Sequence, residues 1–246
     1  MKWILALATG LVVTAAAAQT APAALTMPAY IAAALADPAR AEDAKVDERR
    51  HPAALVEFAG IKPGSKVLEL IPGGGYFTRI FSKVVGADGK VYAEMPSELA
   101  KVDRFKAVAD AYANVEMLRN PAAAPATPEL VDVAFTSQNY HDYPTPYFGN
   151  ADPAQVDQHV VAALKPGGVY IVIDHAAADG SGLRDTDTLH RIDPGYVRKQ
   201  VEAAGFEFVG ESDVLRNPAD DHSLKVFDPA IRGHTDQFVY KFRKPL

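Results

Sequence analysis

Short apolar runs alternate along this chain with segments in which apolar residues recur every three or four positions. Runs of the length typical of buried strands lie at 67–71, 90–95, 115–118, 130–136 and 169–174. Helical spacing is found at 76–84, 97–112 and 154–164. After a helix that ends at Gly205, runs at 206–211 and 237–242 predict two further strands. This alternation favours an α/β fold, a three-layer sandwich with a mostly parallel sheet.

Helical patterns also precede the first strand. Apolar residues at 28–35 and at 52–58 predict helices that pack on one edge or face of the sheet, with a charged stretch between them. Asp47, Arg49 and His51 in that stretch could line the mouth of a pocket. A solvated helix face is the plainer interpretation of the same charges.

The first residues have the pattern of an export signal. Lys2 precedes an apolar centre at 3–13, and Ala16 and Ala18 form an A-x-A site before Gln19. An uncleaved anchor or a chance alanine-rich helix is the alternative, although the apolar run is too short for a membrane span. We therefore expect a signal peptide at 1–18, cleaved after Ala18, and a mature protein in the periplasm or outside the cell.

Beyond the signal, we expect an N-terminal tether with helices at 19–60 and one folded domain at 61–246. The chain has 246 residues, of which 48% are hydrophobic, enough for a full core. The formal charge of -6 argues against a nucleic-acid partner. The sequence contains no basic amphipathic stretch, so we expect no stable membrane association after cleavage of the signal peptide. The absence of cysteine excludes disulfides and thiolate chemistry. Composition does not determine the oligomeric state.

The segment 66–81 carries the strongest local signal. Its apolar strand stops at Pro72, three glycines follow at 73–75, and a helical pattern begins at Tyr76. A glycine turn at the start of a helix lets a ligand approach the backbone and offers free N–H groups to negative charge. Glu69 is an unusual residue in such an apolar strand. A plain tight turn, with Glu69 capping a neighbour, is the alternative.

This segment resembles the first motif of class I S-adenosylmethionine-dependent methyltransferases, acidic-x-Gly-x-Gly-x-Gly. Glu69, Gly73 and Gly75 stand at the acidic and last two glycine positions, and Ile71 stands at the first glycine position. The Pro-Gly-Gly-Gly-aromatic form is similar to an exported bacterial subgroup of predicted methyltransferases. A dinucleotide site fits less well, because Thr78 occupies the place of its last glycine.

The resemblance extends over 61–242 and implies a Rossmann-like sheet of about seven strands with the last strand inserted antiparallel. It implies S-adenosylmethionine as cofactor, with its methionine end held by Glu69, Gly73, Gly74, Gly75 and Tyr76. An acidic residue at the end of the second strand binds the ribose in this class, and Glu94 is the candidate here, with Met95 one residue away. Asn139 and Tyr140 correspond in position to the fourth motif, near the transferred methyl group.

Three histidines follow strands or loops expected on the same rim, namely His141, His175 and His190. An imidazole titrates near neutral pH, so any of them could take a proton from the acceptor. Carboxylates near them in sequence could orient their rings: Asp142, Asp174 and Asp193. The same groups could bind zinc or iron, but no short histidine spacing supports this, and we expect no metal site.

The sequence thus predicts methyl transfer from S-adenosylmethionine to a small-molecule acceptor, an EC 2.1.1 activity. The alternative is an exported methyltransferase-fold protein that has lost methyl transfer. Such a protein would act as a ligand-binding module or as a metal-dependent enzyme, because S-adenosylmethionine is not expected to be abundant outside the cytoplasm. The acceptor cannot be named from the sequence.

Overall fold

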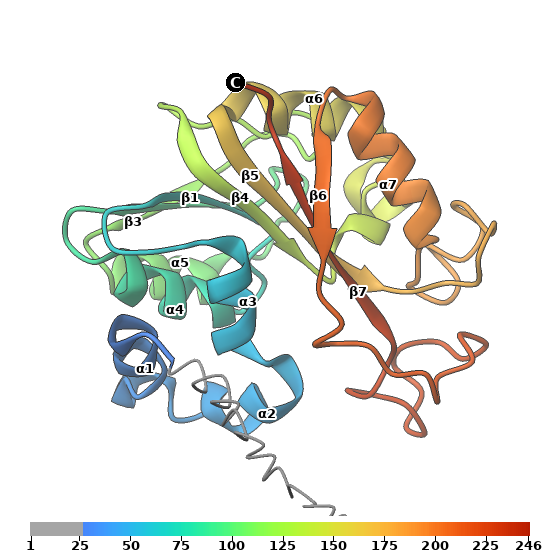
Figure 1. Ribbon diagram of the computed structural model, residues 1–246, viewed down its shortest axis with the longest axis horizontal. Coiled ribbons are helices and arrows are strands. Elements are labelled where there is room, and N and C mark those ends of the chain that lie inside the picture. The colour runs from blue at the N-terminus through green and yellow to red at the C-terminus, as the bar shows by residue number, and fades with distance from the viewer. Residues whose placement is uncertain (1–26) are drawn as a thin grey trace, which may run out of the picture.

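The sheet at the centre of the fold has seven strands in the order β3-β2-β1-β4-β5-β7-β6 (Figure 1). This computed structural model describes residues 27–246, so the predicted signal peptide at 1–18 lies outside the described residues. The strands are β1 (Lys66–Leu70), β2 (Lys90–Glu94), β3 (Val115–Leu118), β4 (Val131–Ser137), β5 (Leu164–His175), β6 (Glu207–Glu211) and β7 (Gln237–Arg243). Strands β1 to β5 pair in parallel, and β7 lies antiparallel between β5 and β6, which confirms the predicted topology.

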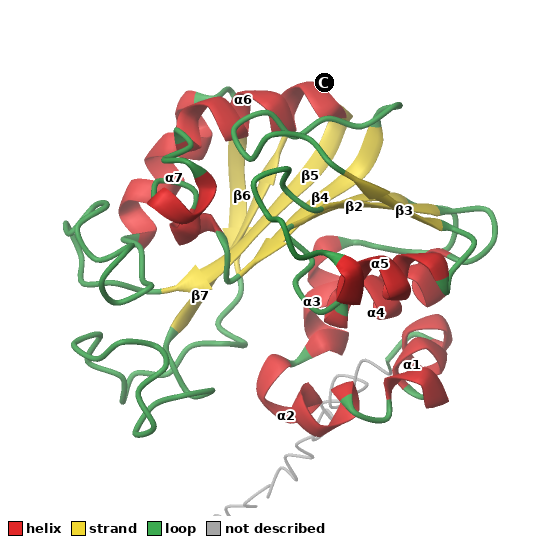
Figure 2. Ribbon diagram, turned by 180° about the vertical axis from the view of Figure 1, so that it is seen from behind, coloured by secondary structure: helices red, strands yellow, loops and turns green. Residues whose placement is uncertain are grey.

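Helices cover both faces of the sheet. They are α1 (Ala29–Leu35), α2 (Asp47–Arg50), α3 (Pro52–Ala59), α4 (Tyr76–Val85), α5 (Asp103–Asp110), α6 (Pro153–Ala163) and α7 (Pro194–Ala203). Short 3-10 turns lie at Pro38–Arg40, Asp43–Val46, Tyr140–Asp142 and Pro146–Phe148. Figures 1 and 2 show α1 to α5 on one side of the sheet, with α6 and α7 on the other.

Two hydrophobic cores hold these layers together. The first joins α1, α3 and α4 to one sheet face and includes Ile31, Phe81 and Phe135, all buried. The second joins α6 and α7 to the other face and includes Val160 and Tyr170. Because residues of α1 and α3 are part of the first core, these N-terminal helices share a hydrophobic core with the sheet.

The register of the central strands brings their carboxyl ends to one edge. Leu70 of β1 pairs with Glu94 of β2 and with Thr136 of β4. The segments that follow these strands therefore begin side by side. In an open parallel sheet this edge is where ligands bind.

Two predicted elements differ from the structure. The helix expected at 97–112 begins only at Asp103, because the backbone N of Ser97 donates to the backbone oxygen of Asn120 at 2.8 Å and holds this segment beside the one that follows β3. The strand expected at 169–174 is part of a longer β5 that begins at Leu164 and contains an irregularity: Val131 pairs with Leu164, but Val133 pairs with Val169.

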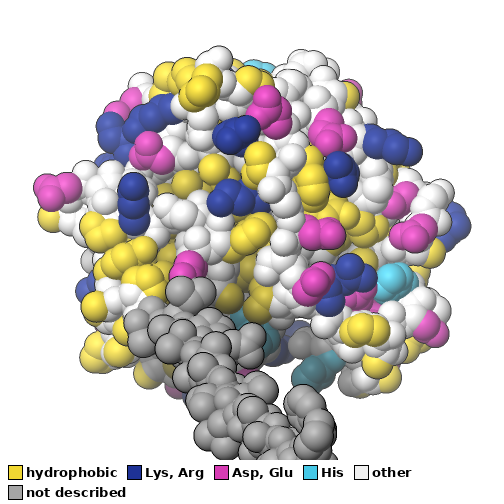
Figure 3. All heavy atoms as spheres, viewed as in Figure 1, with side chains coloured by type: hydrophobic (Ala, Val, Ile, Leu, Met, Phe, Trp, Pro, Cys, Tyr) yellow, Lys and Arg dark blue, Asp and Glu magenta, His cyan; other side chains and the backbone are white. Residues whose placement is uncertain are grey.

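Charged side chains are interspersed on the surface. On the face drawn in Figure 3, outside the grey atoms, Lys and Arg side chains alternate with acidic ones and neither sign forms a continuous patch. Within residues 27–246, none of the helices has both the length and the apolar character needed to cross a bilayer.

Candidate functional site

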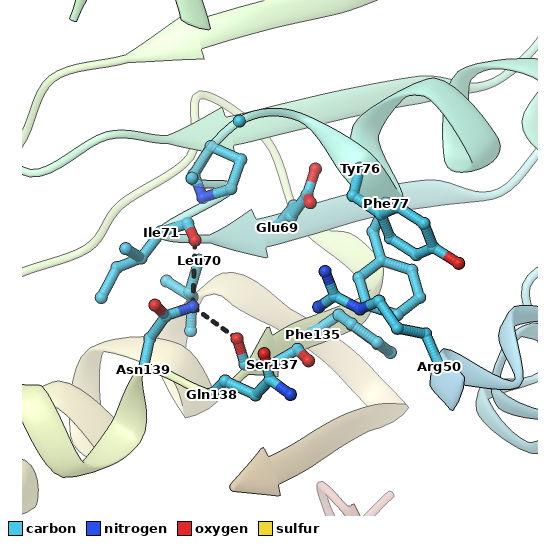
Figure 4. A pocket seen from close by; sticks show the side chains of 13 residues that line it. Arg50, Glu69, Leu70, Ile71, Tyr76, Phe77, Phe135, Ser137, Gln138 and Asn139 are labelled. Atoms are coloured by element: carbon cyan, nitrogen blue, oxygen red, sulfur yellow. Dashed lines mark hydrogen bonds between the residues drawn. The ribbon is translucent and has the colours of Figure 1, made fainter. Parts of the chain in front are cut away.

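A cavity of about 170 Å³ opens at the carboxyl ends of β1 and β4 (Figure 4). Its walls are the turn between β1 and α4, the residues that follow β4, and Arg50 at the end of α2. Of the residues predicted to bind the cofactor, five line it: Glu69, Gly73, Gly74, Tyr76 and Asn139. The glycine turn and the fourth-motif region, which lie far apart in the sequence, therefore share one cavity.

Glu69 is the acidic group of this cavity. Its side chain is buried, and Thr78 Oγ1 donates to Glu69 Oε2 at 2.6 Å. Burial raises the pKa of Glu69 to about 7, although the bond from Thr78 and the charge of Arg50 act in the opposite direction. Near neutral pH this carboxyl group is thus divided between its two protonation states. A cationic ligand group nearby would favour the charged form.

Arg50 brings a guanidinium group to the same cavity. Its Cζ lies 4.3 Å from the ring centre of Tyr76 and 5.0 Å from that of Phe77. Figure 4 shows the group beside these two rings. Burial lowers the pKa of Arg50, and none of the described carboxylates forms an ion pair with it. Arg50 is therefore an unpaired cation in the wall of the cavity.

Ile71 stands where the resemblance calls for a glycine, and its backbone still takes the glycine conformation. Its φ is 52°, in the left-handed region, which costs a residue with a Cβ about 1–2 kcal/mol. Its side chain is buried in the second core, which offsets that cost. Asn139 Nδ2 donates to the carbonyl of Ile71 at 3.0 Å and to that of Ser137 at 2.7 Å, tying the turn to β4.

A second cavity, of about 150 Å³, adjoins the first and shares Arg50 and Gln138 with it. Of the three predicted histidines, only His175 lines it, and His175 Nδ1 lies 2.7 Å from Thr235 Oγ1. Burial lowers the pKa of His175 to about 4. This imidazole is therefore neutral at neutral pH and a weaker base than an ordinary histidine.

The other two histidines lie together outside both cavities. His141 Nδ1 contacts Asp174 Oδ1 at 2.8 Å, and His141 Nε2 lies 3.3 Å from His190 Nδ1. Burial disfavours a charge on His141, but Asp174 and Asp142 raise its pKa to about 10. The suggested partner Asp193 is not near a histidine ring; its side chain caps α7 by accepting from Gly195 N.

A comparison with protein families agrees with this geometry. The model of the family described as protein-L-isoaspartate(D-aspartate) O-methyltransferase (PCMT) matches residues 21–175, more than half of the chain. The chain belongs to this family. It is accordingly a class I S-adenosylmethionine-dependent methyltransferase, and S-adenosylmethionine is its cofactor.

Individual relatives are similar to this chain over most of its length, and a solved structure shares its fold. The ubiquinone/menaquinone biosynthesis C-methyltransferase UbiE of Ectopseudomonas mendocina is 26% identical over 192 residues, which are 76% of this chain and 65% of that protein. UbiE of Shewanella pealeana is 32% identical over 76% of this chain and 66% of its own length. A methyltransferase structure from Aquifex aeolicus is 20% identical, covers 87% of this chain and 96% of its own, and superposes with a TM-score of 0.58, which shows a shared fold.

The described residues fit the methionine end of S-adenosylmethionine. That end carries an ammonium group and a carboxylate, and the cavity offers Glu69 for the first and Arg50 for the second. Gly73 and Gly74 leave the wall open, because a Cβ on Gly73 would meet nothing within 4 Å and one on Gly74 only Arg104, at 3.8 Å or beyond. The cavity thus offers one group of each sign, as the methionine end of the cofactor would require.

Three other predicted cofactor contacts lie outside this cavity. Both carboxylate oxygens of Glu94 accept from Asn120, at 2.8 Å from its backbone N and 2.6 Å from Nδ2, so ribose binding by Glu94 stays a prediction. Tyr140 is buried, and its hydroxyl donates to Asp157 at 2.7 Å, so it supports the core. Gly75 packs against α5, because a side chain added at this position would be directed at Val108.

The two residues shared by the cavities, Arg50 and Gln138, were not among those predicted from the sequence. Arg50 stands beside Arg49 in the charged stretch that could line the mouth of a pocket. This neighbourhood was the one feature of the sequence that could have indicated a role for Arg50 in the site. Gln138 directly follows β4, and its Nε2 donates to Gln237 Oε1 at 2.9 Å. Nothing local in the sequence pairs Gln138 with Gln237, because they are 99 residues apart.

The two outer glycines of the turn are expected to differ in their tolerance of a side chain. Gly75 has φ 80°, and a Cβ there would lie 2.8 Å from Val108 Cγ1, so Gly75→Ala should lower the free energy of unfolding by about 2–4 kcal/mol. Gly73→Ala meets only the conformational cost of φ 57°, about 1–2 kcal/mol. Urea denaturation measures both, with Gly74→Ala as control. Equal losses for Gly73→Ala and Gly75→Ala would contradict the packing role of Gly75.

Proposed function

We propose that this methyltransferase transfers the methyl group of S-adenosylmethionine to a small anionic acceptor bound in the second cavity. The observation that carries the proposal is the charge of that cavity. Its lining contains three guanidinium groups, from Arg49, Arg50 and Arg232, and no carboxylate. An anion would therefore be attracted to this cavity and oriented by hydrogen bonds from planar donors.

The two cavities stand in the relation that methyl transfer needs. They meet at Arg50 and Gln138, so an acceptor in the second cavity would lie next to a donor held in the first. Bound S-adenosylmethionine supplies an electrophilic methyl group on its sulfonium. The protein's own contribution is to align the acceptor with that group and to exclude water, which can provide much of the rate enhancement.

His175 would serve acceptors that must lose a proton. Its imidazole is neutral at pH 7, and in the tautomer in which Nδ1–H donates to Thr235 Oγ1 at 2.7 Å, Nε2 is the basic atom, although burial makes it a weak base. A carboxylate acceptor would need no such base, because it is already ionised at this pH. The neutral His175 would then act only as a hydrogen-bond partner of the acceptor.

The names of similar proteins are compatible with an anionic acceptor but do not choose one. The family is named for O-methylation of isoaspartate, which carries a carboxylate, whereas UbiE is named as a C-methyltransferase. A carbon acceptor would need a separate anionic substituent to use the arginine groups. The charge of the cavity thus narrows the class of acceptor more than the names do.

The double variant Arg49→Met/Arg232→Met tests this proposal. Both side chains are exposed to solvent, which screens their charge, so we expect the KM for an anionic acceptor to rise about tenfold, or about 1.4 kcal/mol. The Kd for S-adenosylmethionine should stay unchanged. The acceptor is found first, by incubating the enzyme with methyl-labelled S-adenosylmethionine and a panel of carboxylates, phosphates and neutral phenols.

Arg198→Met is the matched control, because Arg198 pairs with Glu202 on the surface of α7, outside the cavity lining. Its kinetic constants should equal those of the wild type. Preferential labelling of neutral acceptors, with no effect of the double variant, would refute the anionic acceptor. If the wild type did not bind S-adenosylmethionine, methyl transfer itself would be refuted.

A further inference from the structure

Three side chains outside both cavities bring their potential ligand atoms close together. They are His141 and Asp142, which follow β4, and His190, in the loop before α7. His141 Nε2 lies 3.3 Å from His190 Nδ1 and 3.2 Å from Asp142 Oδ1, and the third edge, from His190 Nδ1 to Asp142 Oδ1, is 3.6 Å. The three atoms thus form a nearly equilateral triangle.

This triangle has the size of one face of a tetrahedral metal site. Zinc binds imidazole nitrogen and carboxylate oxygen at about 2.0–2.1 Å, and a tetrahedral angle then places two such ligand atoms about 3.3–3.4 Å apart. The observed edges of 3.2, 3.3 and 3.6 Å lie close to that value. We propose that His141, Asp142 and His190 bind one divalent zinc ion, which has its fourth position free for water.

Asp174 provides the support that such a site requires. Its Oδ1 accepts from His141 Nδ1 at 2.8 Å, and its Oδ2 accepts from the backbone N of His141, also at 2.8 Å. Asp174 is completely buried, so both bonds are shielded from water. A carboxylate on one ring nitrogen fixes the orientation of the imidazole, and zinc would displace the proton of the other nitrogen, here Nε2, to bind there.

The backbone at His190 is held in a conformation that serves this position. Its φ is 54°, which is uncommon for a residue other than glycine and is maintained only where neighbouring contacts impose it. The next residue, Arg191, is completely buried and donates to the backbone oxygens of Ala176 and Leu224 at 2.9 Å. These contacts hold the loop so that His190 Nδ1 faces the ligand atoms of the other loop.

The site is accessible and separate from the proposed methyl-transfer cavities. The side chain of His190 is 26% exposed and that of Asp142 is 17% exposed, so an ion can enter from solvent. Neither residue, nor His141, lines either cavity. The bound ion would link the segment after β4 to the loop before α7 and thereby stabilise that rim of the fold.

Zinc titration of untagged protein tests the site. After treatment with a chelator and its removal, we expect calorimetry at pH 7.5 to show saturable binding of one Zn²⁺ per chain, and Co²⁺ to give the visible absorption of a tetrahedral site. His190→Ala should abolish both signals. Asp174→Asn should weaken zinc binding at least tenfold, because it removes the carboxylate that orients His141.

Two controls keep the result specific. His222→Ala should bind zinc like the wild type, because His222 pairs with Asp236 instead of the cluster. Zinc should raise the melting temperature of the wild type and leave that of Asp142→Ala unchanged, provided that circular dichroism shows both are folded. No saturable binding by the wild type, or wild-type binding by both His190→Ala and Asp142→Ala, would overturn the site and leave a hydrogen-bonded histidine pair as its explanation.

Discussion

Glu69→Gln is expected to weaken S-adenosylmethionine binding about 10- to 100-fold at pH 8, because it replaces a charge-assisted hydrogen bond to the cofactor's ammonium group, about 1.5–3 kcal/mol. Glutamine keeps the size of Glu69 and can still accept the bond that Thr78 makes at 2.6 Å. The local packing should therefore remain, and only the charge is lost. Isothermal titration of both proteins with S-adenosylmethionine or S-adenosylhomocysteine measures the difference.

The pH dependence of binding gives an independent test of the same charge. The pKa of Glu69 is raised to about 7, so in the wild type cofactor affinity should rise as the pH increases through 7 and the carboxyl group ionises. Glu69→Gln has no proton to lose at this position and should show a flat profile over the same range. If the cofactor affinity of both proteins changed equally with pH, the pH dependence would belong to another group.

Stability of the ligand-free protein should change in the opposite direction. Because the folded-state pKa of Glu69 lies above its ordinary value of 4.5, the folded chain holds this proton more tightly than the unfolded chain. The resulting stabilisation is complete below pH 4.5 and is lost as the pH rises through 7. Free of ligand at pH 8, Glu69→Gln should therefore be more stable than the wild type, by up to about 3 kcal/mol. The difference should vanish near pH 4, and thermal melts at both pH values measure it.

Arg191→Met is expected to lower the free energy of unfolding by about 3–5 kcal/mol, the usual cost of breaking a buried ion pair. The side chains of Arg191 and Asp220 are 0% and 1% exposed, with 2.9 Å between Arg191 Nη2 and Asp220 Oδ2. Removing the guanidinium leaves Asp220 without its charge partner and frees the backbone oxygens of Ala176 and Leu224. Urea denaturation followed by circular dichroism measures the loss.

Arg198→Met provides the matched control for this prediction as well. Arg198 pairs with Glu202 along α7, but both side chains are well exposed, at 48% and 39%, so its loss should cost less than about 1 kcal/mol. Equal effects of Arg191→Met and Arg198→Met would show that Asp220 does not anchor the polar segment at 217–232. A large effect confined to Arg191→Met would confirm the anchor.

The elements of the fold could be predicted from the sequence because their signals are local. An apolar run of strand length, a proline that ends it, and glycines before a helical pattern are all contained in 67–84. The strand at 115–118 agrees with β3 at both ends for the same reason. Where the prediction failed, a distant partner decided the outcome, as when Ser97 bonds Asn120 and delays the start of α5.

The sequence by itself thus determined the fold class, the position of the glycine turn, and Glu69 as its acidic residue, because these follow from residue type and spacing along one segment. Only the tertiary structure decided which side chains meet: Arg50 and Gln138 between the two cavities, Gly75 against Val108, and His190 beside His141. The physical reason is that the direction of a side chain depends on packing between segments far apart in the chain. The spacing of residues within one segment does not determine such contacts.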